Sequence, residues 1–178
     1  MYSATYDSPI GRLIIVSDGE NITELWMDGQ KYYDPSVIDK MKDNNDLPVF
    51  VLTKQWLKRY FVKERPAISE LPLAPNGSEF RQEVWKILCE IPYGVVETYG
   101  NIAKKMAMLT GKPGMSAQAI GGAVGHNPIS IIVPCHRVVG INGSLTGYAG
   151  GIDKKIKLLE LEGVDLSKLY VPTKGTAL

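Results

Sequence analysis

The sequence predicts an α/β protein of the α+β kind, with a small N-terminal sheet-and-helix domain followed by a mostly helical C-terminal domain. Apolar and polar residues alternate over most of residues 1–35, as they do in strands. From residue 78 onward, apolar residues recur mainly at helical spacing. Between these regions, residues 65–77 hold three prolines and a glycine without any period, which is typical of a connection. We therefore predict domains at residues 1–75 and 76–178.

The N-terminal domain begins with three strand-like runs separated by turn-forming residues. The runs are Met1 to Tyr6, Gly11 to Val16 and Ile22 to Met27, with turns at Asp7-Ser8-Pro9, Asp18-Gly19 and Asp28-Gly29. Asp-Gly pairs are strong hairpin signals, so the runs predict an antiparallel meander. Residues 34–47 are polar and are expected to form an irregular loop. Apolar positions at helical spacing from Val49 to Val62 predict a helix that covers one face of the sheet.

The C-terminal domain is expected to start with a helix capped by Ser78 and ending near Pro92-Tyr93-Gly94. A short strand-like run follows from Val95 to Tyr99. A helix from Asn101 to Leu109, capped by Asn101, and a second helix from Met115 to His126 then enclose a glycine-containing turn. This arrangement is a helix-turn-helix pattern, although such pairs also occur as plain packing units.

The second of these helices is unusually rich in glycine and alanine. Its small residues are Ala117, Ala119, Gly121, Gly122, Ala123 and Gly125. Glycine inside a helix costs roughly 1 kcal/mol relative to alanine. A chain accepts this cost where another body approaches closely, which here is either a neighbouring element or DNA.

The chain closes with an amphipathic helix from Asp153 to Leu161 that ends at Gly163. The lysines on this helix, Lys154, Lys155 and Lys157, are expected to form a solvated face. The tail from Ser167 is expected to be poorly ordered unless it packs back on the body of the protein.

Composition and charge restrict the classes of function. The chain has 178 residues and a net charge of +1, so no global basic field indicates nucleic acid. Residues 1–75 carry 9 basic against 11 acidic side chains, and residues 76–178 carry 11 against 8. A DNA-binding surface is therefore expected in the C-terminal half, with a modest salt dependence. The sequence does not open with a basic region followed by an apolar core, and no run approaches ~18 apolar residues, so we expect neither a signal peptide nor a membrane span. Two cysteines without metal-binding spacing favour a reduced, cytoplasmic setting without structural zinc.

The candidate reactive residue is Cys135. The run Ile131-Ile132-Val133 predicts a strand that stops at Pro134, so that Cys135 follows on a turn. His136 and Arg137 both favour a thiolate, the reactive form of cysteine. From chemistry alone, Cys135 is either a nucleophile or a small buried apolar residue. Cys89 is expected to be a packing residue without chemistry.

The segment Pro134-Cys135-His136-Arg137-Val138 resembles the active-site signature of the O6-alkylguanine-DNA alkyltransferases, also called methylated-DNA–protein-cysteine methyltransferases. The flanking segments Gly121 to Pro128 and Asn142 to Gly151 match as well. The resemblance extends from about Ser78 to Gly163 and, less specifically, to Ser8-Pro9-Ile10-Gly11 near the N-terminus. It implies a ribonuclease-H-like N-terminal domain with a scaffolding role.

The resemblance also implies direct-reversal DNA repair. The alkyl group of O6-alkylguanine, and of O4-alkylthymine, passes from duplex DNA irreversibly to a cysteine after the base is flipped out. The protein then acts once, as a monomer, without cofactor or metal. By matching position, Cys135 is the nucleophile, His136 removes its proton through a water, Glu162 orients His136, Asn127 braces the turn and Tyr99 donates a hydrogen bond to the base. His136 and Glu162 are expected to lower the pKa of the Cys135 thiol.

Further site residues follow from the resemblance. The expected base pocket contains Ser130, Val138, Tyr148 and Ala149. The expected DNA contacts, in the minor groove, are Ala117, Gln118, Ala119, Gly121 and Gly122, together with Arg137, which is also expected to pair structurally beneath the site. Gln118 stands where the family usually has an arginine that replaces the flipped base, and Ile129-Ser130 stands where some members have a second proline.

Two rival interpretations remain. One is a non-enzymatic damage-binding relative, which would lack the acceptor cysteine. The other is a helix-turn-helix regulator in which Cys135 is a sensor or a core residue. A regulator is expected to dimerise and to prefer a half-site sequence, whereas a repair protein binds DNA with little sequence preference.

Overall fold

The computed structural model describes residues 1–173, and the chain forms two compact units. Unit 1 consists of Met1–Asn76 together with Pro128–Ile132. Unit 2 consists of Gly77–Asn127 and the described residues from Val133 onward. The transfer of residues 128–132 to unit 1 was not expected from the sequence.

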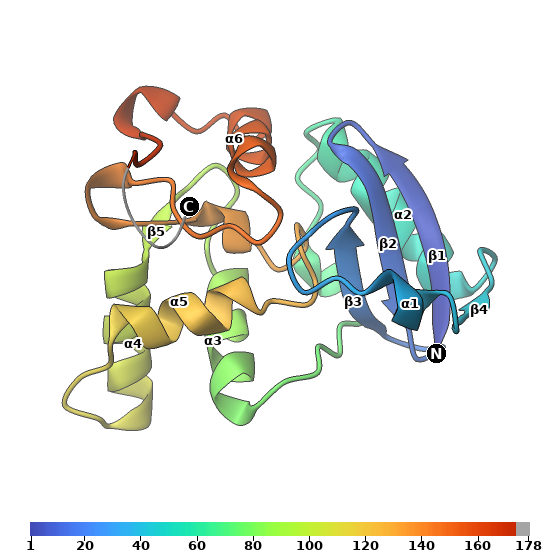
Figure 1. Cartoon of the computed structure of the whole chain (residues 1–178), viewed down its shortest axis with the longest axis horizontal. Helices are drawn as coiled ribbons and strands as arrows, with labels where there is room; N and C mark the ends of the chain where they lie inside the picture. Colours follow the sequence, from blue (N-terminus) through green and yellow to red (C-terminus); the bar gives the residue numbers. More distant parts are fainter. Residues whose placement is uncertain (174–178) are drawn as a thin grey trace. The chain divides into compact units, whose positions relative to one another are not determined.

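Unit 1 is built on a four-stranded sheet with the order β3-β2-β1-β4 (Figure 1). The strands β1 (Tyr2–Ser8), β2 (Gly11–Ser17) and β3 (Ile22–Met27) pair antiparallel with their sequence neighbours. The predicted meander is therefore confirmed. Leu13 pairs with Tyr6 on one side and with Met27 on the other, and residues 13–17 of the central strand are all buried.

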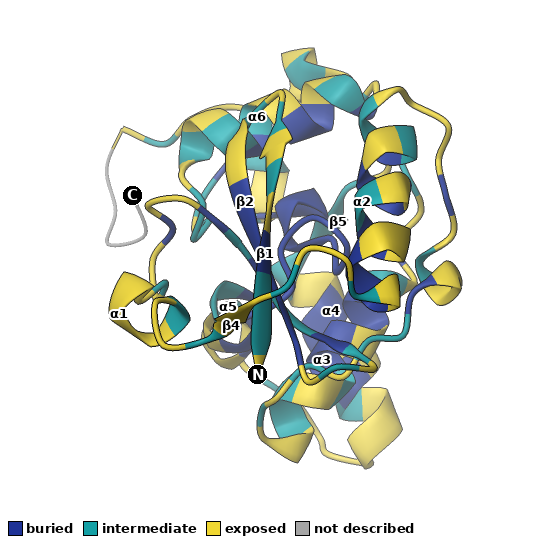
Figure 2. Ribbon diagram, turned by 90° about the vertical axis from the view of Figure 1, so that its right-hand side faces the viewer, coloured by how far each residue is buried: buried dark blue, intermediate teal, exposed yellow. Residues whose placement is uncertain are grey.

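Helix α2 (Pro48–Phe61) confirms the predicted amphipathic helix. Its buried side chains include Phe50, Trp56, Leu57 and Tyr60, whereas the opposite side is exposed (Figure 2). The rings of Trp56 and Tyr60 stack with their centroids 5.5 Å apart. Apolar burial of this kind supplies most of the stability of a helix in water.

The polar segment 34–47 is more ordered than the sequence suggested. It contains helix α1 (Pro35–Ile38), which is capped by the Asp34 side chain, and strand β4 (Lys42–Asp43), which pairs parallel with β1. Both elements are too short to show a periodicity. The connection 65–77 also includes one short 3₁₀ helix, η1 (Ile68–Glu70).

The expected strand Ile131-Ile132-Val133 is wrong, because these residues form a turn. The chain pairs with β3 before this run, at residues 128–130. There, Leu25 of β3 donates to the carbonyl of Pro128 and accepts from the backbone N–H of Ser130. Ile131 has φ of +70°, a conformation that β-branched residues rarely adopt. The apolar character of the run reflects burial rather than strand formation.

Unit 2 is mostly helical. Its helices are α3 (Glu79–Cys89), α4 (Tyr99–Thr110), α5 (Ala117–Gly125) and α6 (Ile152–Leu161); its strands β5 (Glu97–Thr98) and β6 (Val138–Val139) pair in parallel; and its 3₁₀ helices are η2 (Cys135–Arg137), η3 (Ile141–Gly143) and η4 (Leu166–Lys168). The helices α3, α4 and α5 contact one another (Figure 1). The indole N–H of Trp85 donates to the carbonyl of Ala123 at 2.9 Å, which fastens α5 to α3.

The ends of these helices follow their side-chain chemistry. Ser78 caps α3 as predicted, but Thr98 rather than Asn101 caps α4, because its hydroxyl accepts the Asn101 N–H. Asn101 instead bonds Glu97 through its side chain. Tyr170 pairs with Ser144, so the tail does pack back on unit 2. The end of the tail, residues 174–178, lies outside the described residues.

Within residues 1–173, no helix is long and apolar enough to cross a membrane. The same residues hold no cluster of three or more His, Cys, Asp or Glu side chains that could bind a metal ion.

Candidate active site

The site in unit 2 is centred on Cys135, the first residue of η2. Its side chain is buried, and residue Cys135 is only 5% exposed. The side-chain amide of Asn127 donates to the Cys135 sulfur at 3.1 Å and to the carbonyl of Val133 at 2.8 Å. Asn127 follows the C-terminus of α5, so one amide links the end of that helix to Val133, just before the cysteine turn, and to Cys135 itself. Its predicted bracing position agrees with this geometry.

His136 and Arg137 share one carboxylate, that of Glu162. His136 Nε2 lies 2.7 Å from Glu162 Oε1, and Arg137 donates to both carboxylate oxygens at 2.8 and 2.9 Å. Arg137 also donates to the carbonyl of Ile91, and the backbone N–H of Gly94 donates to Glu162. Both ends of the carboxylate are therefore fixed within unit 2.

Arg137 is 6% exposed, so its expected contact with DNA is wrong, whereas its expected structural pairing is confirmed. The sequence was compatible with both DNA contact and structural pairing, because an arginine beside a nucleophile can have either role. Burial decides between them, since an enclosed guanidinium cannot reach a phosphate.

The protonation states follow from this arrangement. Burial by itself would raise the pKa of Glu162, but the hydrogen bonds and charges of His136 and Arg137 outweigh it and lower that pKa well below its usual range. Burial lowers the pKa of His136 and outweighs the opposing effect of Glu162. A neutral His136 therefore donates from Nε2 to an ionised Glu162. Nδ1 is then the ring nitrogen whose lone pair can accept a proton.

The expected lowering of the Cys135 pKa is wrong for the resting protein. Burial raises the pKa of this thiol, and the hydrogen bond from Asn127 and the charge of Lys155 offset that effect only in part. The resting sulfur is therefore a thiol, which must lose its proton when it reacts. Burial likewise raises the pKa of Cys89, to about 11, which agrees with a packing residue.

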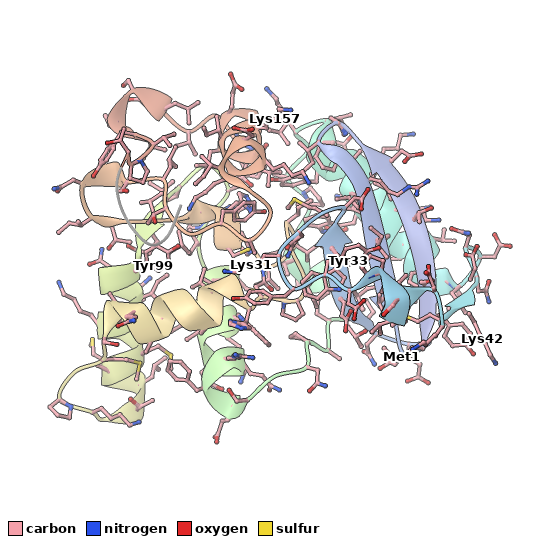
Figure 3. All side chains as sticks on the ribbon, in the orientation of Figure 1. Met1, Lys31, Tyr33, Lys42, Tyr99 and Lys157 are labelled. Atoms are coloured by element: carbon pink, nitrogen blue, oxygen red, sulfur yellow. The ribbon has the colours of Figure 1, made fainter. Side chains whose placement is uncertain are left out.

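Lys155 overturns the expectation of a solvated lysine face. Its side chain is fully buried, whereas Lys157 on the same helix is exposed (Figure 3). The ammonium donates to the carbonyl of Val138 at 2.6 Å and to that of Thr146 at 3.1 Å. A signal was available in the sequence, because position 155 shares a helix face with Ile152 and Leu159.

Two tyrosines stand near the sulfur. The hydroxyl of Tyr99 donates to the carbonyl of Thr146 at 3.2 Å, and burial followed by the nearby Cys135 raises its pKa. Burial and the same cysteine also raise the pKa of Tyr148. The Tyr148 hydroxyl is buried and has no hydrogen-bond partner among residues 1–173. Both hydroxyls thus stay protonated and can donate hydrogen bonds.

The other expected pocket residues divide between the units. Val138 and Ala149 belong to unit 2, where Ala149 is half-buried and the Val138 carbonyl is bound by Lys155. Ser130 belongs to unit 1, and its hydroxyl donates to the side chain of Gln30 at 3.0 Å. Its expected place in the base pocket is therefore unsupported, because the hydroxyl is already used.

The expected DNA contacts on α5 form an open face. Ala117, Gln118, Ala119 and Gly122 are exposed. A Cβ atom added at Gly122 would meet nothing within 4 Å, and one at Gly121 would meet only the Tyr99 ring at 4.0 Å. No element of the described chain requires these glycines for close packing. Of the two explanations for the small residues, an external body is therefore favoured.

A buried cysteine next to a histidine–carboxylate pair is an arrangement that suits an enzyme with a cysteine nucleophile, and the same unit has an open helix face. Comparison with protein families gives the particular family. Residues 79–164 match the DNA binding domain of 6-O-methylguanine DNA methyltransferase, and residues 1–75 match its ribonuclease-like domain. The chain belongs to this family and is a methyltransferase of DNA repair.

Individual relatives support the assignment over nearly the whole chain. The methylated-DNA–protein-cysteine methyltransferase of Haemophilus influenzae is 42% identical over 92% of this chain and 87% of its own length. The protein of the same name from Methanosarcina acetivorans is 44% identical over 92% of this chain and 99% of its own.

Solved structures agree. The crystal structure of the Mycobacterium tuberculosis O6-methylguanine methyltransferase has a TM-score of 0.74 and 41% identity, covering 97% of this chain and 96% of its own. A complex of OGT from that organism with DNA has a TM-score of 0.75 and 38% identity, covering 95% of each chain.

Proposed function

We propose that Cys135 is the alkyl acceptor and that its substrate is O6-alkylguanine, and also O4-alkylthymine, in double-stranded DNA. The observation that carries this proposal is the arrangement of a buried sulfur, the Asn127 amide and the His136–Glu162 pair in one unit. The DNA partner is supported by the OGT complex with DNA, which resembles this chain over nearly its full length.

The transfer is a displacement at the alkyl carbon. The base is first flipped out of the duplex, because its O6 substituent is otherwise enclosed in the stack. His136 Nδ1 takes the proton of the Cys135 thiol through a bridging water, and the sulfur forms a bond to the alkyl carbon. The bond from that carbon to O6 breaks, and its electron pair leaves with the purine. The Tyr99 hydroxyl, which bonds Thr146 in the resting protein, then donates to the leaving base.

Helices α4 and α5 are proposed to act as a helix-turn-helix pair that presents the small-residue face of α5 to the minor groove. Gln118, exposed on that face, is proposed to occupy the place of the flipped base. No side chain of the site offers a route for removing a thioether, so each molecule is proposed to react once. We further propose a monomer that works in the cytoplasm without a cofactor.

The decisive experiment is the intact mass of the protein after incubation with a duplex that contains O6-methylguanine. We expect a gain of one methylene group, located on the peptide that holds Cys135, with undamaged duplex as the control. Cys135→Ser should abolish the gain and still bind the damaged duplex, whereas Cys89→Ser should react normally. An adduct that persists in Cys135→Ser would refute the assigned acceptor. Binding without any adduct, together with dimerisation and half-site preference, would favour a regulator.

A further inference from the structure

A lysine buried as completely as Lys155 needs a reason, because burial disfavours its charged form. Lys155 is 0% exposed and lies on α6, among helix positions that face the core of unit 2. Its neighbour Lys157 shows that this helix can keep a lysine in solvent. An apolar side chain at position 155 would fill space without this cost, so the charge itself has a role.

The ammonium connects two separate parts of the site. Val138, whose carbonyl accepts at 2.6 Å, directly follows the η2 turn that carries Cys135 and His136. Thr146, whose carbonyl accepts at 3.1 Å, lies in the loop that leads to Tyr148. The same Thr146 carbonyl accepts from Tyr99. A single group therefore ties the cysteine turn to the loop and to the residue assigned to the leaving base.

We propose that Lys155 is a positioning residue, whose ammonium holds the cysteine turn and the 144–151 loop together and opposes the negative charge that develops on Cys135. This inference rests on the proposed role of Cys135 as acceptor. Lys155 acts through the carbonyls of Val138 and Thr146 and through its charge, rather than by bonding to the reacting atoms.

The other charged groups around the site are not available to oppose a negative charge on Cys135. The charge of Lys155 acts on Cys135 and His136 of η2, and its Nζ lies 6.0 Å from the ring centroid of Tyr148. Tyr99 shares the Thr146 carbonyl with Lys155, and Glu162 binds His136 and Arg137. Arg137 is engaged by Glu162, and burial keeps His136 neutral. Lys155, in contrast, binds two backbone carbonyls and no carboxylate, so its charge is available to oppose a negative charge on Cys135.

The lysine and the cysteine influence each other reciprocally. Burial lowers the pKa of Lys155 to about 8, and a charge on Cys135 acts in the opposite direction. The Lys155 charge in turn lowers the pKa of Cys135. Lys155 is charged below about pH 8. Its stabilisation of a charge on Cys135 is therefore present at neutral pH and is lost as the pH rises through that value. Charge-assisted hydrogen bonds to the two carbonyls weaken in the same range.

The test compares Lys155→Met and Lys155→Arg with Lys157→Met, which removes the same charge from an exposed position of α6. Second-order rates of alkyl transfer from free O6-alkylguanine base and from a damaged duplex are measured between pH 6 and pH 9.5. We expect the wild-type rate to fall above about pH 8, where Lys155 loses its proton. Lys155→Met should be slower by on the order of tenfold, the effect of one unit in the thiol pKa, and should lack the alkaline fall.

Two further variants distinguish the effect of the charge at position 155 from the effect of side-chain shape. Lys155→Arg should recover part of the rate and keep it at high pH, because arginine does not titrate there. Lys157→Met should match the wild-type protein. The loss in Lys155→Met should affect free base and duplex equally, with DNA binding unchanged. A Lys155→Met protein with the wild-type rate and pH profile, or a loss confined to the duplex, would overturn the proposal.

A measurement without a variant at position 155 keeps the proposal testable even if Lys155→Met does not fold. In protein labelled at the lysine ε-carbons, one NMR signal should titrate near pH 8, far below the ~10.4 of exposed lysines. A set of lysine signals that all titrate near ~10.4 would refute the buried charge. If the wild-type protein forms no adduct at all, the proposed function fails while this titration can still be observed.

Discussion

At the scale of single residues, the protonation state of Cys135 determines how the protein reacts. Burial raises the pKa of its thiol. We therefore expect an apparent pKa above the free value of roughly 8.5 and little thiolate at neutral pH. The measurement is thiolate absorbance against pH, taken as the difference between Cys89→Ser and the Cys89→Ser/Cys135→Ser double variant.

The same shift predicts how stability depends on pH. Because the folded pKa of Cys135 is raised, the folded state retains this proton longer than the unfolded chain. The free energy of unfolding should consequently decrease as the pH rises from roughly 8.5 toward the folded pKa, and Cys135→Ser should remove that part of the dependence. A substantial thiolate signal at pH 7 would contradict the expectation and would indicate a sulfur that is activated before substrate arrives.

The sequence predicted which side chains form the site better than it predicted their burial and protonation states. Cys135, His136, Glu162 and Asn127 come together as the resemblance implied. The burial that makes Arg137 a structural residue could not be read from its sequence neighbours. The burial of Lys155 was missed although its helix face carries Ile152 and Leu159. The direction of the Cys135 pKa was wrong for the same reason, because desolvation outweighs the nearby donors.

At the scale of elements, the glycines of α5 lower the stability of that helix and leave its surface open. Gly122 is exposed, and a Cβ there would meet nothing within 4 Å. Gly122→Ala should therefore raise the free energy of unfolding by up to about 1 kcal/mol, through helix propensity alone. Gly122→Leu should fold equally well and bind duplex DNA more weakly, because its side chain would occupy the groove-facing surface.

Thermal unfolding and DNA titration distinguish these outcomes, with the reaction of free O6-alkylguanine base as a control that needs no groove contact. If Gly122→Leu bound and repaired a duplex like the wild-type protein, the open face of α5 would not be the DNA-contacting surface.

Gln118 tests the same helix from its exposed side. Its amide is shorter than the arginine usual in the family and carries no charge, but it can both donate and accept hydrogen bonds. Gln118→Ala should slow repair of a duplex and leave reaction with free base unchanged, since only the duplex requires flipping. Gln118→Arg should tighten DNA binding and steepen its salt dependence by about one phosphate equivalent or less. Equal harm to both substrates in Gln118→Ala would instead make Gln118 a support of the pocket.

Elements with a clear period were predicted well. Most short ones were not, although β5 (Glu97–Thr98) lies within the strand expected from Val95 to Tyr99. The meander and α2 match the sequence because alternation and helical spacing extend over many residues. Strand β4 spans two residues, and the cap of α4 depends on which of two neighbouring polar side chains reaches the first amides. The 131–133 run was mistaken for a strand because buried turns and buried strands share the same apolar composition.

At the scale of the whole molecule, the chain does not divide at one point. Residues 128–132 leave unit 2 between Asn127 and Val133 and pair with β3 in unit 1. No composition boundary marks this excursion, because the pairing partner Leu25 is about a hundred residues earlier in the chain. The N-terminal unit therefore holds part of the connection between α5 and the cysteine turn, so it is more than an appended domain.

Alkylation is expected to destabilise the molecule once repair is complete. The Cys135 sulfur is buried and accepts a hydrogen bond from Asn127, so a methyl group on it adds volume to a closed site and weakens that bond. Overpacking of this kind typically costs roughly 1–3 kcal/mol. For a chain of this size, each kcal/mol lowers the melting temperature by about 2–4 °C.

Calorimetry of the alkylated protein against protein incubated with undamaged duplex measures the difference, after DNA has been removed from both samples. Because the chain forms two units, the transition of unit 2 is the one that should move. Larger alkyl groups should lower the melting temperature further, since each added methylene must be accommodated in the same closed space. An unchanged or raised melting temperature would show that the site around Cys135 has room for its product, and the raised pKa of the thiol would then reflect a dry site rather than a tightly filled one.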